Sequence, residues 1–242
     1  MMNEQKDLIQ KIVEKAKNLE EKLIERRRHI HMYPETAFEE YETQKYIEEE
    51  LKKAGYEPVR IAGTGVMAIL EGEHPGPTIG LRADIDALNV EETNDVPYKS
   101  KNKGKMHACG HDAHTACLLT AAEILKEYKS QLHGKIKFFF QPAEEGGGGG
   151  KKIVDEGHLN DVDYIFGLHV WKDQEAGVIG TRKGPMLASA DAFSITIKGK
   201  GGHAASPHQT IDPTSVLVDT VSYTHLRAHE TRHDLVCRLL LE

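Results

Sequence analysis

Apolar residues recur along this chain in two alternating patterns, and the alternation predicts an α/β architecture. Helical spacing covers residues 4–31 and about 38–53, where Gly55 supplies a helix stop. Short buried strands are predicted at GVMAILEG, TIGLRADIDAL, KIKFFF and DYIFGLHV, with a further helix at HTACLLTAAEILKEYKSQL. Strands that alternate with helices favour a largely parallel sheet, in which binding sites form beyond the carboxyl ends of the strands.

The pattern changes near residue 187. Ile195 and Ile197 alternate with polar neighbours as in a half-exposed strand, and a glycine turn follows in GKGGHAASPH. Asp212 is the expected cap of a helix whose first residue is Pro213. We therefore expect a first domain over residues 1–186 and a second domain that begins at 187.

Composition narrows the class of protein and its partners. A chain of 242 residues can bury a sizeable core, and its net charge of -7 argues against a nucleic-acid partner. Three cysteines without a framework spacing favour a reducing cytoplasm over a disulfide-stapled secreted fold. No signal-peptide core opens the chain and no window approaches a membrane span, so we expect no membrane partner.

Three segments that follow strand-like runs hold the side-chain types that bind metals: MHACGHDAHTA, FFFQPAEEGGGGG and FGLHVW. Cys109 and His111 stand on either side of a glycine turn, and thiolate, imidazole and carboxylate are ligands for zinc and related ions. Glu144 and Glu145 are adjacent, so from an extended chain they would point in different directions. One could then bind a metal while the other acts as a general base towards a substrate.

Each of these patterns also has a structural interpretation. Alone, the CxH pair is typical of a buried cysteine beside surface histidines. Alone, the two glutamates are typical of a solvated acidic turn, although the five glycines that follow suggest close backbone approach. His169 is either a satisfied core histidine or a ligand, and His203 is either a surface histidine or a substrate contact. A phosphate-binding loop is excluded, because Glu145 and Lys152 stand where that motif needs a glycine and a hydroxyl.

The motifs RADIDAL, MHACGHDAH, FFFQPAEEGGGGG, GLHV and KGKGGHAASPH resemble, in order and spacing, those of the hippurate hydrolases and N-acyl-amino-acid amidohydrolases. This branch of the aminoacylase and carboxypeptidase superfamily also holds auxin-conjugate hydrolases and N-acetyldiaminopimelate deacetylases. The resemblance runs from about Arg26 to about Val221. It implies a zinc-peptidase-like α/β catalytic domain with an inserted α/β lid domain that mediates dimerisation.

The resemblance also implies roles for individual residues. The implied ligands of two divalent ions, whether zinc, manganese, cobalt or nickel, are Cys109, His111, Glu145 and His169. Glu144 matches the general base, Asp86 an acidic position that supports the metal site, and His203 a lid histidine that acts on the substrate. The implied reaction cleaves the amide bond of a small N-acyl amino acid, such as an N-acetyl or N-benzoyl derivative, through a metal-bound hydroxide. The implied assembly is a cytoplasmic homodimer.

Further expectations concern the last part of the chain. Proteins of this kind are longer and their last metal-binding histidine follows the lid, so we expect an incomplete lid at 187–221 and one ligand too few. Residues 222–242 resemble translated adapter sequence and are expected to be non-native. They contain HETRH, a formal match to the zincin motif through His229, Glu230 and His233, but the charged Arg232 argues against a zincin site. The alternative to an active enzyme is a catalytically inactive metal-binding fragment.

Overall fold

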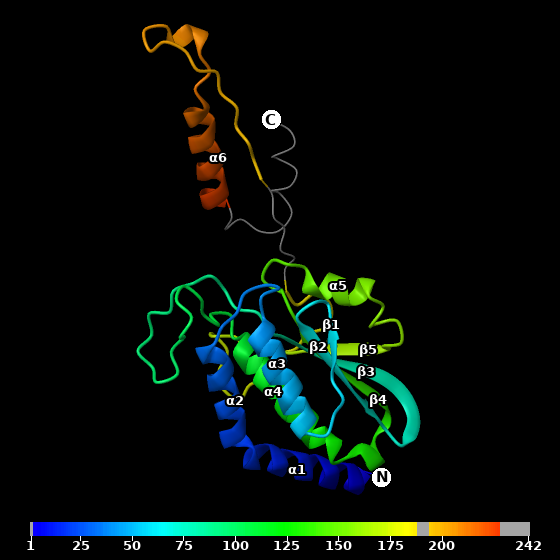
Figure 1. Cartoon of the computed structure of the whole chain (residues 1–242). Coiled ribbons are helices and arrows are strands. Elements are labelled where there is room, and N and C mark those ends of the chain that lie inside the picture. The colour runs from blue at the N-terminus through cyan, green and yellow to red at the C-terminus, as the bar shows by residue number, and fades with distance from the viewer. Residues whose placement is uncertain (1, 188–193, 228–242) are drawn as a thin grey trace. The chain divides into compact units, whose positions relative to one another are not determined.

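The computed structural model describes residues 2–187 and 194–227, and the chain divides into two compact units at residues 176 and 177 (Figure 1). The first unit holds the sheet and the helices that cover it. Its elements are α1 (Met2–Asn18), α2 (Glu20–Met32), α3 (Tyr41–Lys53), β1 (Val59–Ile61), β2 (Gly65–Glu71), β3 (His74–Asp84), α4 (His111–Lys126), η1 (Lys129–Gln131), β4 (His133–Gln141), α5 (Gly149–Asp155) and β5 (Tyr164–Gly167).

The five strands form one mixed sheet in the order β1-β2-β4-β3-β5. Strand β3 pairs in parallel with β4 and with β5, whereas β2 pairs antiparallel with β1 and with β4. The expectation of a largely parallel sheet is therefore wrong for one half of it. Only two residues separate β2 from β3, which is too short for a crossover between parallel strands, so the chain reverses direction there.

The run of three phenylalanines in β4 shows why both faces of the sheet are covered. Phe138 and Phe140 belong to the larger core, to which α3 and α4 contribute apolar side chains. Phe139 points to the opposite face, where it packs with Ile61 and with Ile153 of α5. Successive side chains of a strand point to opposite faces, so a run that is buried throughout is typical of a strand covered on both sides.

The first predicted helix is interrupted. Leu19 separates α1 from α2, whereas helical spacing predicted one helix over residues 4–31. Both helices pack against α4, so the chain bends between them to keep that contact (Figure 1). None of the helices in the described part of the chain is long and apolar enough to cross a bilayer.

The second unit holds η2 (Pro207–Gln209) and α6 (Pro213–Arg227). Thr214 donates its backbone N–H to Asp212 Oδ1 at 2.9 Å, which confirms the predicted cap with Pro213 as the first helical residue. The strand expected around Ile195 is not formed: residues 194–199 have no regular structure, and Lys200 and Ile211 form only an isolated bridge. A strand without a neighbour to pair with is not stable. That residues 187–221 belong to a lid stays a prediction.

Candidate metal centre

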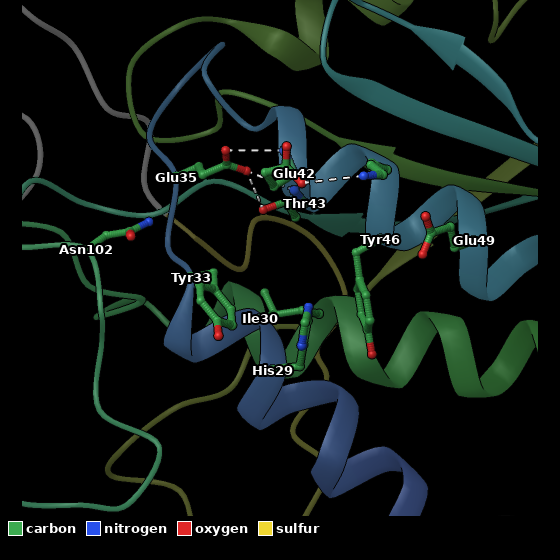
Figure 2. Close-up of a pocket in the computed structure, with 10 residues that line it drawn as sticks. His29, Ile30, Tyr33, Glu35, Glu42, Thr43, Tyr46, Glu49 and Asn102 are labelled. Carbon is green, nitrogen blue, oxygen red and sulfur yellow. Dashed lines mark hydrogen bonds and ion pairs between the residues drawn. The ribbon is translucent and has the colours of Figure 1, made fainter.

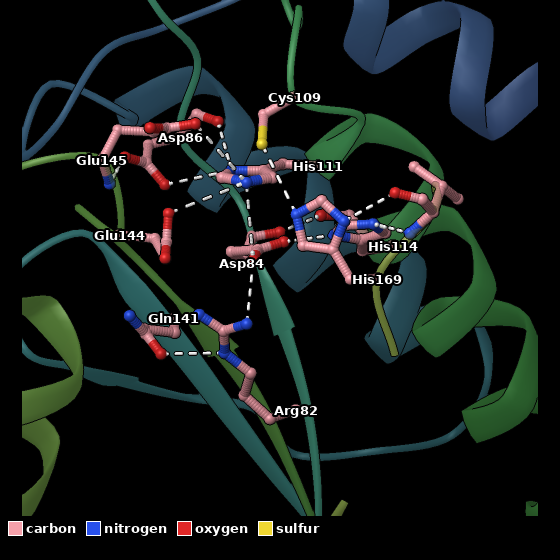
Figure 3. A network of polar contacts seen from close by, with 12 residues as sticks. Arg82, Asp84, Asp86, Cys109, His111, His114, Gln141, Glu144, Glu145 and His169 are labelled. Atoms are coloured by element: carbon pink, nitrogen blue, oxygen red, sulfur yellow. Dashed lines mark hydrogen bonds and ion pairs between the residues drawn. The ribbon is translucent and has the colours of Figure 1, made fainter. Parts of the chain in front are cut away.

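The carboxyl ends of the three parallel strands meet the beginning of α4 at one edge of the sheet (Figure 3). Asp84 ends β3, the two glutamates follow β4, and His169 follows β5. Cys109 and His111 lie at the start of α4. The three segments that the sequence singled out therefore come together beyond the strand ends, as predicted.

Gly110 is the reason that α4 can begin within this cluster. Its φ of +90° lies in the left-handed region, which favours glycine. A Cβ at Gly110 would also lie 2.4 Å from Cγ2 of Val170. The glycine turn thus presents Cys109 and His111 at the helix start and lets the segment of His169 approach closely.

His111 lies at the centre of the cluster and is buried. Its Nδ1 donates to the backbone oxygen of Asp86 at 2.9 Å, which fixes the orientation of the ring. Nε2 then faces carboxylate oxygens, with Asp84 Oδ2 at 3.5 Å, Glu145 Oε1 at 3.8 Å and Glu144 Oε2 at 3.9 Å. Burial lowers the pKa of His111, but the surrounding carboxylates outweigh burial and raise it above its ordinary value.

Cys109 and His169 contribute the softer donors. Cys109 Sγ lies 3.4 Å from His169 Nε2, and His169 Nδ1 donates to the Val170 backbone oxygen at 2.7 Å. Burial, and then the negative charge of Glu145 and the other carboxylates, raise the pKa of the Cys109 thiol to about 12. His169 itself is exposed, so the expected apolar surroundings of this imidazole are not observed.

Glu144 and Glu145 do not diverge as an extended chain would require. They lie in a turn that follows Ala143, whose φ is +51°, and both carboxylates come within 4 Å of His111 Nε2. The reason is the glycine run: a Cβ at Gly149 would lie 1.7 Å from Pro142 O, so the chain folds back on itself. Close backbone approach at these glycines is thereby confirmed, and the expected extended geometry is corrected.

Asp86 links two parts of the cluster. Besides its backbone contact with His111, its Oδ2 accepts the backbone N–H of Glu145 at 2.9 Å. His203 lies in the second unit, exposed in a loop, where its Nδ1 accepts the backbone N–H of Ala205 at 3.1 Å. The HETRH motif and Cys237 lie outside the described residues.

The cluster has the properties of a site for divalent cations. Three groups of possible metal ligands all include His111, and within each group the donor atoms lie within 4.8 Å of one another. The groups are Cys109, His111 and His169; Asp84, His111 and His114; and His111, Glu144 and Glu145. His111 Nε2 is buried and has no hydrogen-bond partner in the described part of the chain. A buried lone pair among carboxylates and a thiol fits a metal ion of the zinc type.

Two residues of this region were not predicted. Asp84 and His114 are both buried, and His114 Nδ1 lies 2.6 Å from Asp84 Oδ1. A signal was present in the sequence, because His114 stands three residues after His111 and therefore faces the same side of α4.

A cavity of about 460 Å³ lies elsewhere in the first unit, between α2 and α3 (Figure 2). Its lining includes His29, Tyr33, Glu35, Tyr46 and Glu49. It shares no residue with the three donor groups, so the candidate centre is the cluster around His111.

Comparison with known proteins assigns the chain to a family of peptidases. Residues 80–235 match the model of peptidase family M20/M25/M40. The chain belongs to this family, which confirms the resemblance drawn from its ordered motifs.

Three relatives illustrate the family. The chain is 49% identical over 211 residues to thermostable carboxypeptidase 2 of Saccharolobus solfataricus, covering 86% of this chain and 54% of the relative. It is 51% identical over 197 residues to the N-acetyl-L-cysteine deacetylase of Bacillus subtilis, covering 81% and 47%. The structure of the Bacillus subtilis YXEP protein, a dinuclear metal binding peptidase, is similar with a TM-score of 0.68 and 42% identity, covering 70% and 48%. The chain spans about half the length of these relatives.

Proposed function

We propose that the protein is a metal-dependent amidohydrolase that cleaves the amide bond of N-acyl amino acids to a free amino acid and a carboxylic acid. The observation that carries the proposal is the buried Nε2 of His111, which faces carboxylates and has no hydrogen-bond partner in the described part of the chain. A relative that deacetylates an N-acetyl amino acid and a related dinuclear metal-binding peptidase support it.

Two divalent ions are the proposed cofactors. The residues that would hold them are Cys109, His111, Glu145 and His169. When bound, such ions polarise an amide carbonyl and lower the pKa of a water molecule. Asp86 orients two of these ligands: its backbone oxygen accepts a hydrogen bond from His111, and its carboxylate accepts the backbone N–H of Glu145.

Glu144 is the proposed general base. Its side chain is 42% exposed whereas that of Glu145 is 23% exposed, so Glu144 is the carboxylate that can meet a water and a substrate. Glu144 Oε2 would accept the proton of the attacking water as the new C–O bond forms, and would return it to the amine nitrogen as the C–N bond breaks.

His203 is the proposed substrate contact from the second unit. Since its Nδ1 accepts a backbone N–H, its ring proton is on Nε2, which can then donate to an oxygen of the substrate.

The proposed assembly is a homodimer in the cytoplasm, and the proposed metal is zinc, manganese, cobalt or nickel. Three cysteines without the spacing of a disulfide framework support a reducing compartment.

Removal of the metal and of the base tests the proposal. Protein stripped with a chelator should lose hydrolysis of N-acetyl and N-benzoyl amino acids and regain it with zinc, manganese or cobalt. Glu144→Gln should lower kcat by about 10²–10⁴ while the bound metal per chain stays unchanged. The matched control is Glu49→Gln, an exposed glutamate of α3, which should leave kcat as in the wild type.

Two results would contradict the proposal in different ways. Hydrolysis that persists in chelated Glu144→Gln protein would refute the mechanism. Tight metal binding without turnover would instead favour the rival interpretation, a catalytically inactive metal-binding fragment.

A further inference from the structure

We propose that His114 is a positioning residue that holds the segment of His169 in place through the backbone of Val170, and that it is not itself a metal ligand. Only one part of this inference rests on the proposed function, namely that the hydrogen bond places His169 as a metal ligand. The hydrogen bonds that carry it join protein atoms only.

Both ring nitrogens of His114 are engaged in hydrogen bonds. Nδ1 lies 2.6 Å from Asp84 Oδ1, and Nε2 accepts the backbone N–H of Val170 at 2.9 Å. A carboxylate can only accept and an amide N–H can only donate, so the ring proton is on Nδ1 and the lone pair of Nε2 is occupied. An imidazole with both nitrogens used in this way has no lone pair for a metal, although its atoms lie near His111 and Asp84.

Asp84 is held firmly enough to anchor His114. Its other oxygen, Oδ2, accepts from Arg82 Nη1 at 2.8 Å, and the residue is buried at the end of β3. Arg82 in turn donates from Nε to Gln141 Oε1 at 2.8 Å on the neighbouring strand (Figure 3). Charge-assisted hydrogen bonds of this kind are among the stronger ones in proteins, so His114 is attached to the sheet itself.

Val170 passes this restraint to His169. Its side chain lies against the Gly110 turn, where any Cβ would come within 2.4 Å of Cγ2. Its backbone oxygen accepts from His169 Nδ1 at 2.7 Å, which turns His169 Nε2 towards Cys109 Sγ. His169 lies on an exposed segment after β5, so without His114 this segment would lose its hydrogen bond to α4.

Three substitutions separate the two hydrogen bonds. His114→Phe keeps a ring and removes both bonds. His114→Asn keeps a donor near the position of Nδ1 but no acceptor for Val170, and His114→Gln can keep an acceptor for Val170. Tyr56→Phe is the matched control, because it removes another buried hydrogen bond to α4, the one from Tyr56 Oη to the backbone oxygen of Ala122 at 2.7 Å.

The measurement is amide hydrogen exchange of Val170 in the metal-free 242-residue chain, followed by zinc titration. Exchange at Val170 should be at least tenfold faster in His114→Phe and His114→Asn than in the wild type, and close to wild type in His114→Gln and Tyr56→Phe. Zinc affinity should fall about 10- to 100-fold in His114→Phe. The ¹⁵N signals of His114 should report the Nδ1–H tautomer with and without metal.

Three outcomes would overturn the inference. Unchanged protection of Val170 in His114→Phe would remove its basis, and equal acceleration in Tyr56→Phe would show general destabilisation of α4. Coupling of bound ¹¹³Cd to a nitrogen of His114 would show that His114 is a ligand. If no variant and no wild-type chain binds metal, the proposed function fails, while the exchange result still decides the role of His114.

Discussion

Gly110 decides how closely two separate parts of the candidate centre approach each other. The residue combines a left-handed backbone conformation with a contact to Val170 that leaves no space for a Cβ. A left-handed φ costs a non-glycine residue roughly 1–2 kcal/mol. A Cβ at this position would also push Val170 away and displace the segment that carries His169.

We therefore expect Gly110→Ala to lower the free energy of unfolding by about 2 kcal/mol or more and to weaken metal binding. Gly104→Ala is the control, because Gly104 has a φ of +74° but no neighbouring atom closer than 3.9 Å. Urea unfolding and zinc titration of both variants measure the effects. Equal losses in the two variants, with zinc affinity unchanged, would show that the contact with Val170 is unimportant.

The chemical types in the centre could be read from the sequence, but their directions could not. Cys109 and His111 flank a visible glycine, and the donors after β4 and β5 stand in short motifs. The convergence of Glu144 and Glu145 depends on the left-handed Ala143 and on the folded glycine run, which residue spacing does not encode. The bond from His114 to Val170 joins residues that are 56 positions apart, so only the fold reveals it.

Helix α2 is fastened to α3 and α4 by a buried arginine. Arg26 donates to Glu50 Oε2 at 2.8 Å, to Thr120 Oγ1 at 3.0 Å and to Glu123 Oε2 at 2.6 Å. Burial raises the pKa of Glu50, but its hydrogen bonds with Lys53 and Arg26 outweigh burial and hold the pKa below its ordinary value. A buried charge with several partners is costly to disturb, so this network holds three helices together.

Glu50→Gln should lower the free energy of unfolding by about 2 kcal/mol at pH 7. Because the folded pKa of Glu50 lies below the unfolded value of about 4.3, its contribution is complete above that value and is lost as the pH falls through the folded pKa. The difference between wild type and variant should therefore shrink below about pH 4. Denaturant unfolding across pH 3–8 measures it, with exposed Glu49→Gln as the control. A difference that stays constant down to pH 3 would contradict this account.

Strands with strong apolar runs were predictable, whereas their directions and the shortest strand were not. The predicted runs correspond to β2, β3, β4 and β5. The prediction of a buried strand is wrong for β5, whose four residues are exposed. Strand β1 has only three residues, too few for a pattern. The antiparallel pairing of β2 with β4 depends on which strand inserts between β2 and β3, and local spacing carries no information on that choice.

The molecule as a whole combines a metal-type site in its first unit with a second unit that carries His203. Four of the donors come from segments after three different strands, so a bound ion would connect β3, β4, β5 and α4. A ligand that binds only the folded state stabilises it, which couples metal binding to the folding of the first unit. The sequence predicted this assembly through its ordered motifs, and family membership confirms the class of protein.

Cobalt titration of the metal-free chain, followed by absorption spectroscopy, tests the metal centre most directly. A thiolate bound to cobalt absorbs in the near ultraviolet, and we predict that this band grows with added cobalt and saturates in the wild type. It should be absent in Cys109→Ser and retained in Cys117→Ser, which replaces the other free cysteine of the described residues, eight positions further along in α4. A band that survives in Cys109→Ser, or a wild-type chain that binds no cobalt, would contradict the proposed site.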